Sequence, residues 1–502
     1  MKSPSEQKDK IDTEKPMKVM FIYSLEDIQS AQAPLRSWST IQFGISYISS
    51  VLKAHGHQTQ LLVLGSNQWK ESIKIVRTSI EKFAPRLVCF TAVYSQYAFI
   101  EKISRFIKSH WPDRFLLIGG VHATLNPQEV IDGPFDALCI GEGEYPALEL
   151  CRQLENLYVP KAIANLWIKS PDGSIEKNKP RDFLQDIDTL PFPDRQMWKP
   201  WMKEQIGNEL AVLLGRGCPY NCTYCSNHAL RKITQGKYVR MRSPENTLQE
   251  VAFLHKNYLN NKEIFFEVES IALDKTWMLE LCSQLAYFNS TIHHALSYGC
   301  NFRISPQSVD EDLFTAMKKA NFHKINIGLE SGSERIRREV LKRNYSNDDF
   351  LNVVSLARKY GLKIYVFNMI GLPGESLNDH KETVLLNRRC QPEGHFTGIF
   401  FPYPGTQLYN TCIQQRLIQG NPRTQMERKQ PIIELPNFSK TQIRNAYTWF
   451  NYHVYRRNRP LWRILIQVIA VKIQSNPTAN LLFRKIVRLP MLRQLRAKLA
   501  RN

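Results

Sequence analysis

Apolar and polar residues alternate along the first part of the chain in a pattern that predicts strands and helices in turn. Short apolar runs predict strands, and segments with apolar residues every three or four positions predict helices. The expected strands are residues 19–23, 59–64, 87–93, 114–118 and 137–140, and the expected helices are residues 43–53, 69–83, 98–109 and 145–154. This alternation predicts an α/β fold with a doubly wound, Rossmann-like parallel sheet.

A second series of the same kind occupies the middle of the chain. Its expected strands are residues 209–214, 263–266, 294–298, 324–327, 363–369 and 396–401, with helical patterns between them. Six such units predict a partial (βα)6 TIM-type barrel rather than the full eight. After Pro422 the pattern becomes helical and basic.

These patterns divide the chain into five parts. Residues 1–16 are charged and lack an apolar core, so we expect a disordered tail and no secretory signal. Residues 17–158 form the first expected domain and residues 206–420 the barrel. Between them, residues 159–205 contain a Pro-Asp-Gly turn and several prolines, and we expect a linker there. Residues 421–502 form a basic helical region.

The net charge of +21 comes mainly from the end of the chain. The chain has 67 Lys and Arg against 46 Asp and Glu, and residues 437–502 hold 14 of the basic residues and no acidic one. The remaining 53 basic residues nearly balance the 46 acidic ones. The excess charge therefore predicts an anionic partner for the tail rather than for the rest of the chain.

Arginine and leucine are interleaved in this tail, a pattern that suits an anionic membrane surface. RNA is an alternative partner, but aromatic residues are sparse there beyond Trp462, which disfavours nucleic acid. A helical cap packed on the barrel, with a solvated basic face, is the other alternative. Since no run of about 18 apolar residues occurs, we expect a cytoplasmic protein with peripheral contact at the inner membrane surface.

Three of the ten cysteines, Cys218, Cys222 and Cys225, lie on one loop after the first strand of the expected barrel. Three thiolates at this C-x3-C-x2-C spacing can hold three irons of a 4Fe–4S cluster and leave the fourth iron open to a ligand. Zinc is the alternative, because His228 follows closely and could complete a Cys3His site.

This cysteine motif, at the end of the first strand of a partial barrel, resembles the radical S-adenosylmethionine (radical SAM) superfamily. In that family the open iron chelates the methionyl amino and carboxylate groups of SAM. One electron then cleaves SAM to methionine and a 5′-deoxyadenosyl radical, which abstracts hydrogen from the substrate. The cofactor carries this chemistry, and the protein positions and shields it.

Later motifs resemble the same family in order and spacing. Glu269 after the second strand matches the second member of an acidic pair, whereas Val268 departs from the first. Arg303 follows the third strand. The resemblance implies that Glu269 accepts hydrogen bonds from the amino group of SAM and that Arg303 contacts its carboxylate. A solvated acid and a surface arginine are the alternatives.

Two glycine-rich turns complete the implied SAM site. Glu330 and Ser331 lie in a Gly-Leu-Glu-Ser-Gly-Ser turn after the fourth strand, and Ile370 and Gly371 open a Gly-Leu-Pro-Gly-Glu turn after the fifth. The resemblance implies that Glu330 faces the ribose or methionyl part of SAM and that the backbone at Ile370 and Gly371 meets adenine. Tyr224, inside the cysteine loop, is a further candidate for SAM binding.

The first domain resembles the cobalamin-binding domain that precedes some radical SAM barrels. The implied cobalamin-binding residues lie in three loops: Gly44; Gly119, Gly120 and His122; Gly141, Glu142 and Gly143. Ile41 and Gln42 replace the usual Pro-Pro, and no Asp-x-His-x-x-Gly element supplies a histidine to cobalt. His122 is therefore expected to shape its loop rather than to bind cobalt.

The resemblance implies a cobalamin-dependent radical SAM methyltransferase. The cofactors would be a 4Fe–4S cluster, SAM and cobalamin, with the methyl group of SAM reaching an unactivated carbon or phosphorus of a small-molecule or lipid-like substrate. A flavodoxin or ferredoxin would supply electrons. The alternatives are radical oxidation, cyclisation or rearrangement without methyl transfer, sulfur insertion into tRNA, and a zinc-bearing RNA-binding module. Sulfur insertion is disfavoured because Cys89, Cys139 and Cys151 fall in expected strands or a helix.

Overall fold

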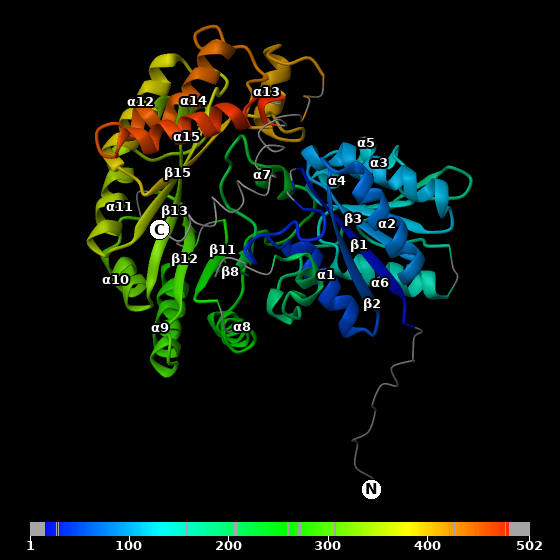
Figure 1. The fold of residues 1–502 in the computed structure, drawn as a ribbon. Coiled ribbons are helices and arrows are strands. Elements are labelled where there is room, and N and C mark those ends of the chain that lie inside the picture. The colour runs from blue at the N-terminus through cyan, green and yellow to red at the C-terminus, as the bar shows by residue number, and fades with distance from the viewer. Residues whose placement is uncertain are drawn as a thin grey trace, which may run out of the picture. The chain divides into compact units, whose positions relative to one another are not determined.

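The computed structural model describes residues 16–480, except 27, 29, 157–158, 204–208, 259–260, 270, 272–273, 306–307, 421, 423, 425–426 and 477. The N-terminal tail at residues 1–15 and the last basic segment at residues 481–502 lie outside the described residues. The chain forms two compact units (Figure 1). Unit 1 comprises Met1–Ala211 and Leu230–Arg242, and unit 2 comprises Val212–Ala229 and Ser243–Asn502.

Unit 1 is built on a seven-stranded sheet with the order β2-β1-β3-β4-β5-β6-β7. The first five strands pair in parallel, and β6 and β7 are antiparallel. The strands are β1 (Lys18–Leu25), β2 (Gln58–Gly65), β3 (Leu87–Thr91), β4 (Phe115–Gly119), β5 (Ala137–Cys139), β6 (Leu166–Lys169) and β7 (Ile175–Lys177). The chain changes direction across the sheet between β1 and β3, which is where doubly wound sheets bind ligands.

Helices cover both faces of this sheet, so its central strands are apolar almost throughout. Apolar residues of α2, α3 and α5 pack on one face, and α1 and α6 lie together on the other (Figure 1). The helices are α1 (Phe43–Ala54), α2 (Trp69–Phe83), α3 (Tyr94–His110), α4 (Val121–Leu125), α5 (Pro127–Ile131) and α6 (Glu144–Glu155). The doubly wound parallel sheet expected from the sequence is confirmed.

Much of the expected linker at residues 159–205 belongs to unit 1. The hairpin β6–β7 extends the first sheet, and the proline-rich segment after it, which includes the short 3-10 helices Ile187–Thr189 and Gln196–Trp201, packs on the same unit. The Trp198 indole is fully buried and donates a hydrogen bond to Ser46 Oγ at 2.8 Å. Asp194 accepts one from Ser49 Oγ at 2.7 Å. Prolines suggested an extended connection, but these buried side chains fix the segment to α1.

Unit 2 contains a six-stranded sheet with the order β15-β14-β13-β12-β11-β8. Its strands are β8 (Glu209–Leu213), β11 (Glu263–Glu267), β12 (Ser297–Phe302), β13 (Phe322–Glu330), β14 (Lys363–Ile370) and β15 (Gly394–Ile399). The pairs from β11 to β15 are parallel. The six expected strands are present, although β12 begins three residues later than the sequence pattern indicates. Two short strands, β9 (Gly215–Arg216) and β10 (Arg240–Met241), lie outside this sheet.

Helices on the outer side of this sheet separate its strands in sequence (Figure 1). They are α8 (Pro244–Asn257), α9 (Lys275–Thr291), α10 (Glu311–Lys319), α11 (Asn347–Lys359) and α12 (Leu377–Cys390), with α7 (Asn227–Leu230) after the cysteine loop, a short π-helix (Ile336–Val340) and α13 (Gln407–Gln414) after β15. Most of them begin at a serine, threonine or aspartate whose side chain accepts a hydrogen bond from the first turn, as Ser243 does in α8.

The described part of the basic region forms α14 (Lys440–Tyr455) and α15 (Leu461–Gln474). The helix α14 packs on α12, β14 and β15, and α15 packs on α14. Phe438, Ile443, Phe450, Ile464 and Val468 share one buried cluster with Ile370 of β14. These helices therefore complete the core of unit 2. No helix within the described residues is long and apolar enough to cross a membrane.

Phe450 tests whether α14 is part of the unit 2 core. Its ring is 1% exposed and meets the His395 ring edge-on at 4.8 Å between centroids. Phe450→Ala should lower the free energy of unfolding by about 3–5 kcal/mol, because a buried cavity remains. Urea denaturation followed by circular dichroism measures the loss. The neighbouring control Trp449→Ala, at a position that is 41% exposed, should cost far less; equal losses would contradict this role of α14.

Candidate functional site

The cysteine loop follows β9 in unit 2. Cys218 and Cys222 are buried, Cys225 is half-buried, and all three are free thiols. The Cys225 backbone N–H donates to Cys222 O at 3.1 Å, and Asn227 Nδ2 donates to Cys225 Sγ at 3.5 Å. Burial raises the pKa of Cys218 to about 11 and also raises that of Cys225. These thiols therefore lose their protons when a metal binds rather than in the metal-free protein.

The donor set of this loop fits an iron–sulfur cluster better than zinc. Three sulfur atoms on one short loop are the ligands that such a cluster takes. His228 Nε2 is engaged by the protein, because it accepts a hydrogen bond from the Gln407 backbone N–H at 3.1 Å. Across the described ranges, no three His, Cys, Asp or Glu side chains converge on a position for a single metal ion.

Arg303 lies against the cysteine loop. Its Nη1 donates to Cys222 Sγ at 3.2 Å, and its guanidinium carbon lies 3.6 Å from the centre of the Tyr220 ring. The guanidinium of Arg303 therefore lies between the Tyr220 ring and the Cys222 sulfur. Glu269 is exposed, yet it is close enough to contribute to the raised pKa of Cys218. The two charged candidates from the sequence therefore lie near the cysteines.

Glu330 ends β13 in a strained conformation. Its φ of +66° lies in the left-handed region, which costs a non-glycine residue about 1–3 kcal/mol. The register between β13 and β14 shifts between Gly328 and Glu330. A Cβ at Gly328 would lie 2.6 Å from Glu330 Oε1, so a larger residue there would displace this carboxylate oxygen. The strand end is thus shaped to turn one carboxylate inward.

Tyr224 and Arg343 hold that carboxylate. Tyr224 donates its hydroxyl to Glu330 Oε1 at 3.0 Å, and Arg343 Nη1 donates to the Tyr224 hydroxyl at 3.0 Å and lies 3.4 Å from Glu330 Oε1. Burial raises the pKa of Glu330, and the positive charge of Arg343 opposes that rise. We call Tyr224, Glu330 and Arg343 the buried triad. Because Tyr224 lies between Cys222 and Cys225, the triad ties the cysteine loop to β13.

The Gly-Leu-Pro-Gly-Glu turn is held by Glu375. Glu375 Oε2 accepts the Gly371 backbone N–H at 2.6 Å and the Leu372 backbone N–H at 2.9 Å. Burial raises the pKa of Glu375 to about 8. Ile370 is fully buried, and Gly371 has a φ of +82°. The turn is thus fixed by internal hydrogen bonds, and Phe400 N–H donates to Ile370 O at 2.8 Å.

Ser331 is placed inside the protein. Its hydroxyl accepts the Ser333 backbone N–H at 3.2 Å and lies 3.4 Å from Thr383 Oγ1 of α12. A Cβ at Gly332 would lie 2.4 Å from the Thr383 Cα. This turn therefore packs tightly on α12, and the Ser331 side chain serves that packing.

In unit 1, the expected cobalamin loops lie at the carboxyl ends of the parallel strands. Gly44 stands in the first turn of α1, and a Cβ there would meet no described atom within 4 Å. Gly120 has a φ of +95°, and its Cβ would lie 2.7 Å from Thr91 Oγ1. A Cβ at Gly119 meets only an ordinary contact with Cys139. The open space at Gly44 fits the close approach of a large ligand.

The loop after β5 is fixed by one ion pair. Arg240 Nη1 donates to Glu142 Oε1 at 2.9 Å and to Oε2 at 3.1 Å, and the Leu184 backbone N–H donates to Oε2 at 3.0 Å. Gly141 has a φ of +83°, and a Cβ at Gly143 would lie 2.9 Å from Ile48 Cδ1. The Glu142 carboxylate is thus engaged by protein groups, and the Gly141 backbone N–H donates to Thr124 Oγ1 at 3.1 Å.

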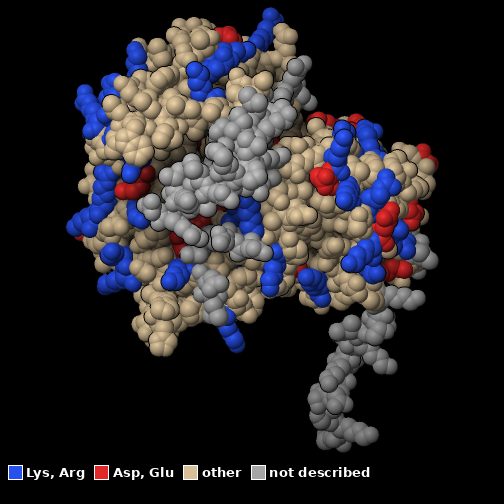
Figure 2. Space-filling model, in the orientation of Figure 1, with Lys and Arg blue, Asp and Glu red and all other residues tan. Residues whose placement is uncertain are grey.

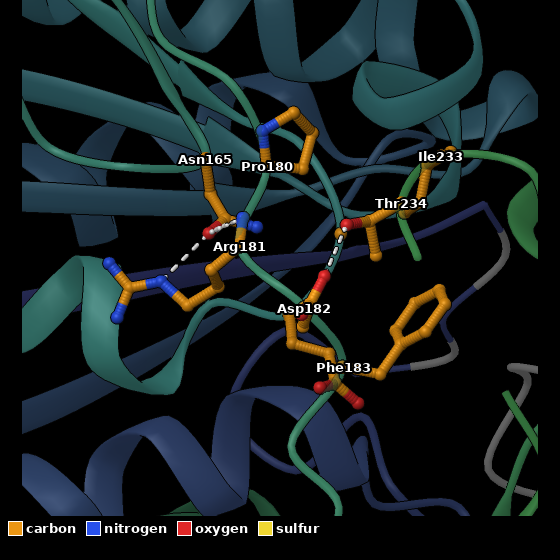
Figure 3. A pocket seen from close by; sticks show the side chains of 9 residues that line it. Asn165, Pro180, Arg181, Asp182, Phe183, Ile233 and Thr234 are labelled. Carbon is orange, nitrogen blue, oxygen red and sulfur yellow. Dashed lines mark hydrogen bonds between the residues drawn. The ribbon is translucent and has the colours of Figure 1, made fainter. Parts of the chain in front are cut away.

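A small hollow lies beside this loop, and several of the residues that line it contact one another (Figure 3). Arg181 donates from Nε to Asn165 Oδ1 at 2.9 Å and pairs with Glu149 at 3.0 Å. Asn165 Nδ2 donates to Ile140 O at 2.7 Å. These groups support the loop. The hollow is lined by Gly141, Glu142, Asn165, Pro180, Arg181, Asp182, Phe183, Ile233 and Thr234.

His122 lies in an aromatic box of its own unit. Its ring centre is 4.5 Å from that of Tyr97 and 5.4 Å from that of Tyr94, and its Nδ1 meets Asn126 Nδ2 at 3.2 Å. Burial lowers the pKa of His122 to about 4. These contacts fit the expectation that His122 shapes its loop.

Cys89, Cys139 and Cys151 are buried in the core of unit 1, and each is a free thiol. Burial raises the pKa of Cys139 to about 12. They therefore serve as core residues. Within the described residues they form no second metal site of the kind that sulfur insertion into tRNA would need.

The comparisons with known proteins agree with both units. Residues 212–386 match the radical SAM superfamily model, and residues 39–151 match the B12 binding domain model. An uncharacterized methyltransferase of Pyrococcus horikoshii is 26% identical over 445 residues, which cover 87% of this chain and 93% of that protein. The cytidylyl-2-hydroxyethylphosphonate methyltransferase of Streptomyces wedmorensis is 22% identical, covering 79% of this chain and 82% of that protein.

Two further similarities concern a cyclase and a solved structure. The anaerobic magnesium-protoporphyrin IX monomethyl ester cyclase of Rubrivivax gelatinosus is 22% identical, covering 73% of this chain and 65% of that protein. The structure of the cobalamin-dependent SAM radical enzyme OxsB, with aqua-cobalamin and SAM bound, shares the fold with a TM-score of 0.67 at 14% identity. It covers 94% of this chain and 75% of that chain.

The fold, the cysteine loop and these matches define an enzyme of the radical SAM class. The chain belongs to the B12-binding radical SAM enzyme family. Its cofactors are accordingly a 4Fe–4S cluster, SAM and cobalamin.

Sequence reasoning missed three of the residues that shape the site. Arg343 belongs to no motif, and Tyr220 occupies one of the unspecified positions of the cysteine motif. Nothing local marks them as partners of Glu330 and Arg303. Glu375 stands inside the quoted glycine-rich turn, and its spacing of four residues from Gly371 could have suggested that it caps the turn.

Arg343 tests the energetic role of the buried triad. Arg343→Met should lower the free energy of unfolding by about 3–5 kcal/mol, because the buried carboxylate of Glu330 loses its cation. Urea denaturation measures this loss. The matched double variant Glu330→Gln with Arg343→Met should lose less than the single variant, since no unpaired charge remains. A double variant that loses the sum of both single effects would contradict the pairing.

Glu375 predicts a pH dependence of stability. Its pKa is about 8 in the folded protein, well above the ordinary value for glutamate, so folding takes up a proton between those two pH values. The free energy of unfolding should therefore fall by a few kcal/mol as the pH rises from about 5 to 8. Glu375→Gln stays neutral and should flatten that decline. Parallel pH profiles of the two proteins would contradict the prediction.

Proposed function

We propose that this enzyme transfers a methyl group from SAM to an unactivated carbon or phosphorus of a small-molecule or lipid-like substrate. The observation that carries the proposal is that one chain matches both the B12 binding domain model, over residues 39–151, and the radical SAM superfamily model, over residues 212–386. Cobalamin, when bound, supplies a carrier for the methyl group. Two of the similar proteins are methyltransferases, one of them acting on a phosphonate.

We assign the cofactors to the loops that the family resemblance implies. Cys218, Cys222 and Cys225 would hold three irons, and Arg303 donates a hydrogen bond to Cys222 Sγ. Glu269, the end of β13 at Glu330 and the backbone at Gly371 would bind SAM. In unit 1, the backbone near Gly44 and the turns at 119–120 and 141–143 would hold cobalamin.

The concave face of the second sheet would receive the substrate. Successive strand residues point to opposite faces, and the face that carries Glu330 also carries a polar row. In that row Asn326 Nδ2 meets Asn301 Oδ1 at 3.4 Å, and Asn301 Nδ2 donates to Glu267 Oε2 at 3.1 Å.

Beside this row stand Phe367 and Phe396, stacked with their ring centres 4.9 Å apart. Phe396 is 54% exposed. A face that is polar on β11–β13 and aromatic on β14–β15 suits a substrate with both a hydrogen-bonding group and an apolar part. This supports a small amphipathic or lipid-like substrate, and a flavodoxin or ferredoxin would deliver the electron.

The products of SAM distinguish the proposal from its rivals. The anaerobically reconstituted protein, loaded with cobalamin and reduced with dithionite, should convert SAM to both S-adenosylhomocysteine and 5′-deoxyadenosine, as measured by mass spectrometry. S-adenosylhomocysteine should disappear when cobalamin is omitted. The triple variant Cys218→Ala, Cys222→Ala, Cys225→Ala should lose iron and 5′-deoxyadenosine, whereas the control Cys282→Ala should retain both.

Two results would argue against methyl transfer. Formation of 5′-deoxyadenosine without S-adenosylhomocysteine would favour radical cyclisation or oxidation, as the similarity to a cyclase allows. Zinc in place of iron, with neither product formed, would overturn the whole assignment.

A further inference from the structure

The helix α15 exposes a strip of large apolar side chains. Five of them are between 43% and 60% exposed, and we call them the α15 face: Leu461, Trp462, Leu465, Ile466 and Ile469. At about 100° per residue they fall within an arc of about 140°. Exposed apolar residues are normal when scattered, but a continuous strip of this kind marks an interaction surface.

The packing of α15 on the rest of unit 2 leaves the α15 face exposed. Ile464 and Val468, on another side of α15, are buried in the cluster that α14 and β14 share. The far end of the helix is fixed by a hydrogen bond from Gln430 Nε2 to Ser475 O. The helix is therefore folded before it meets a partner, and the partner need not order it.

Positive charge surrounds the α15 face. Arg456, Arg457, Arg463 and Lys472 are exposed along and just before the helix. In Figure 2, the region where Figure 1 labels α14 and α15 is largely uncharged, with Lys and Arg at its margin. The sequence from residue 437 to residue 502 contains no Asp or Glu. An apolar strip with a purely basic surrounding sequence is complementary to an anionic lipid surface.

We propose that the α15 face docks this enzyme on an anionic bilayer surface. The helix has 14 residues and is about 21 Å long, too short to cross a hydrocarbon core of about 30 Å. It would lie in the plane of the membrane, with Trp462 and the leucine and isoleucine side chains among the lipids and the basic side chains at the headgroups.

Charge disfavours the other two occupants. A second copy placed on this face by a two-fold axis would bring arginine to arginine. Residues 481–502 carry seven Lys and Arg and no acidic residue, so their sequence brings like charge as well. The proposal goes beyond methyl transfer and does not depend on it.

Vesicle sedimentation with the full-length protein tests this docking. The wild type should bind vesicles of equal parts phosphatidylcholine and phosphatidylglycerol, and should bind pure phosphatidylcholine vesicles at least ten-fold more weakly. Leu465→Gln with Ile469→Gln should lower the partition coefficient on the anionic vesicles at least ten-fold. The matched control Phe253→Gln with Tyr287→Gln, two exposed apolar positions on α8 and α9, should bind like the wild type.

Three outcomes would overturn the proposal. The wild type failing to bind anionic vesicles would mean that residues 481–502 or a second copy cover the face. Unchanged binding by the Leu465→Gln, Ile469→Gln variant would place membrane contact elsewhere. A wild-type dimer that this double substitution turns into a monomer, with vesicle binding unchanged, would identify a second copy as the occupant.

Discussion

The position of the cysteine loop in unit 2 depends on one buried interaction, the triad of Tyr224, Glu330 and Arg343. Tyr224 is placed in the cysteine loop between two of the three cysteines, and its hydroxyl contacts the carboxylate at the end of β13. The left-handed backbone at Glu330 is costly, and the hydrogen bonds of the triad hold it in place. A loop of three thiols thereby acquires a fixed position on a parallel sheet.

The same design recurs at the other turns of both units. A buried charged or polar side chain accepts or donates hydrogen bonds that fix the turn. Glu375 does so for the turn at Gly371, and Glu142 with Arg240 does so for the turn at Gly141. The carboxylates that shape these turns are thus engaged by groups of the protein itself.

Helices and strands could be predicted from the sequence, because their apolar residues recur at short, regular intervals. Alternating strands and helices indicated both sheets, and motifs at strand ends indicated the candidate site, because the carboxyl ends of parallel strands lie at one edge. Residues that lie far apart in the sequence but touch in the fold show no such repeat. Arg343 lies more than one hundred residues from Tyr224, and Arg240 lies nearly one hundred residues from Glu142. The Pro-Asp-Gly turn of the expected linker marks the hairpin β6–β7, but three- and four-residue strands carry too little pattern to show that they extend the first sheet. Prolines hid the packing of Trp198.

The central claim is that the cysteine loop holds a cluster with one iron left for SAM. Electron paramagnetic resonance of the reconstituted, dithionite-reduced protein tests it most directly, with SAM carrying ¹⁵N in its methionyl amino group. The account predicts a hyperfine coupling between that nitrogen and the reduced cluster, present in the wild type and absent in Cys222→Ala. A cluster signal in the wild type that shows no coupling to the labelled nitrogen, or no cluster signal at all, would contradict it.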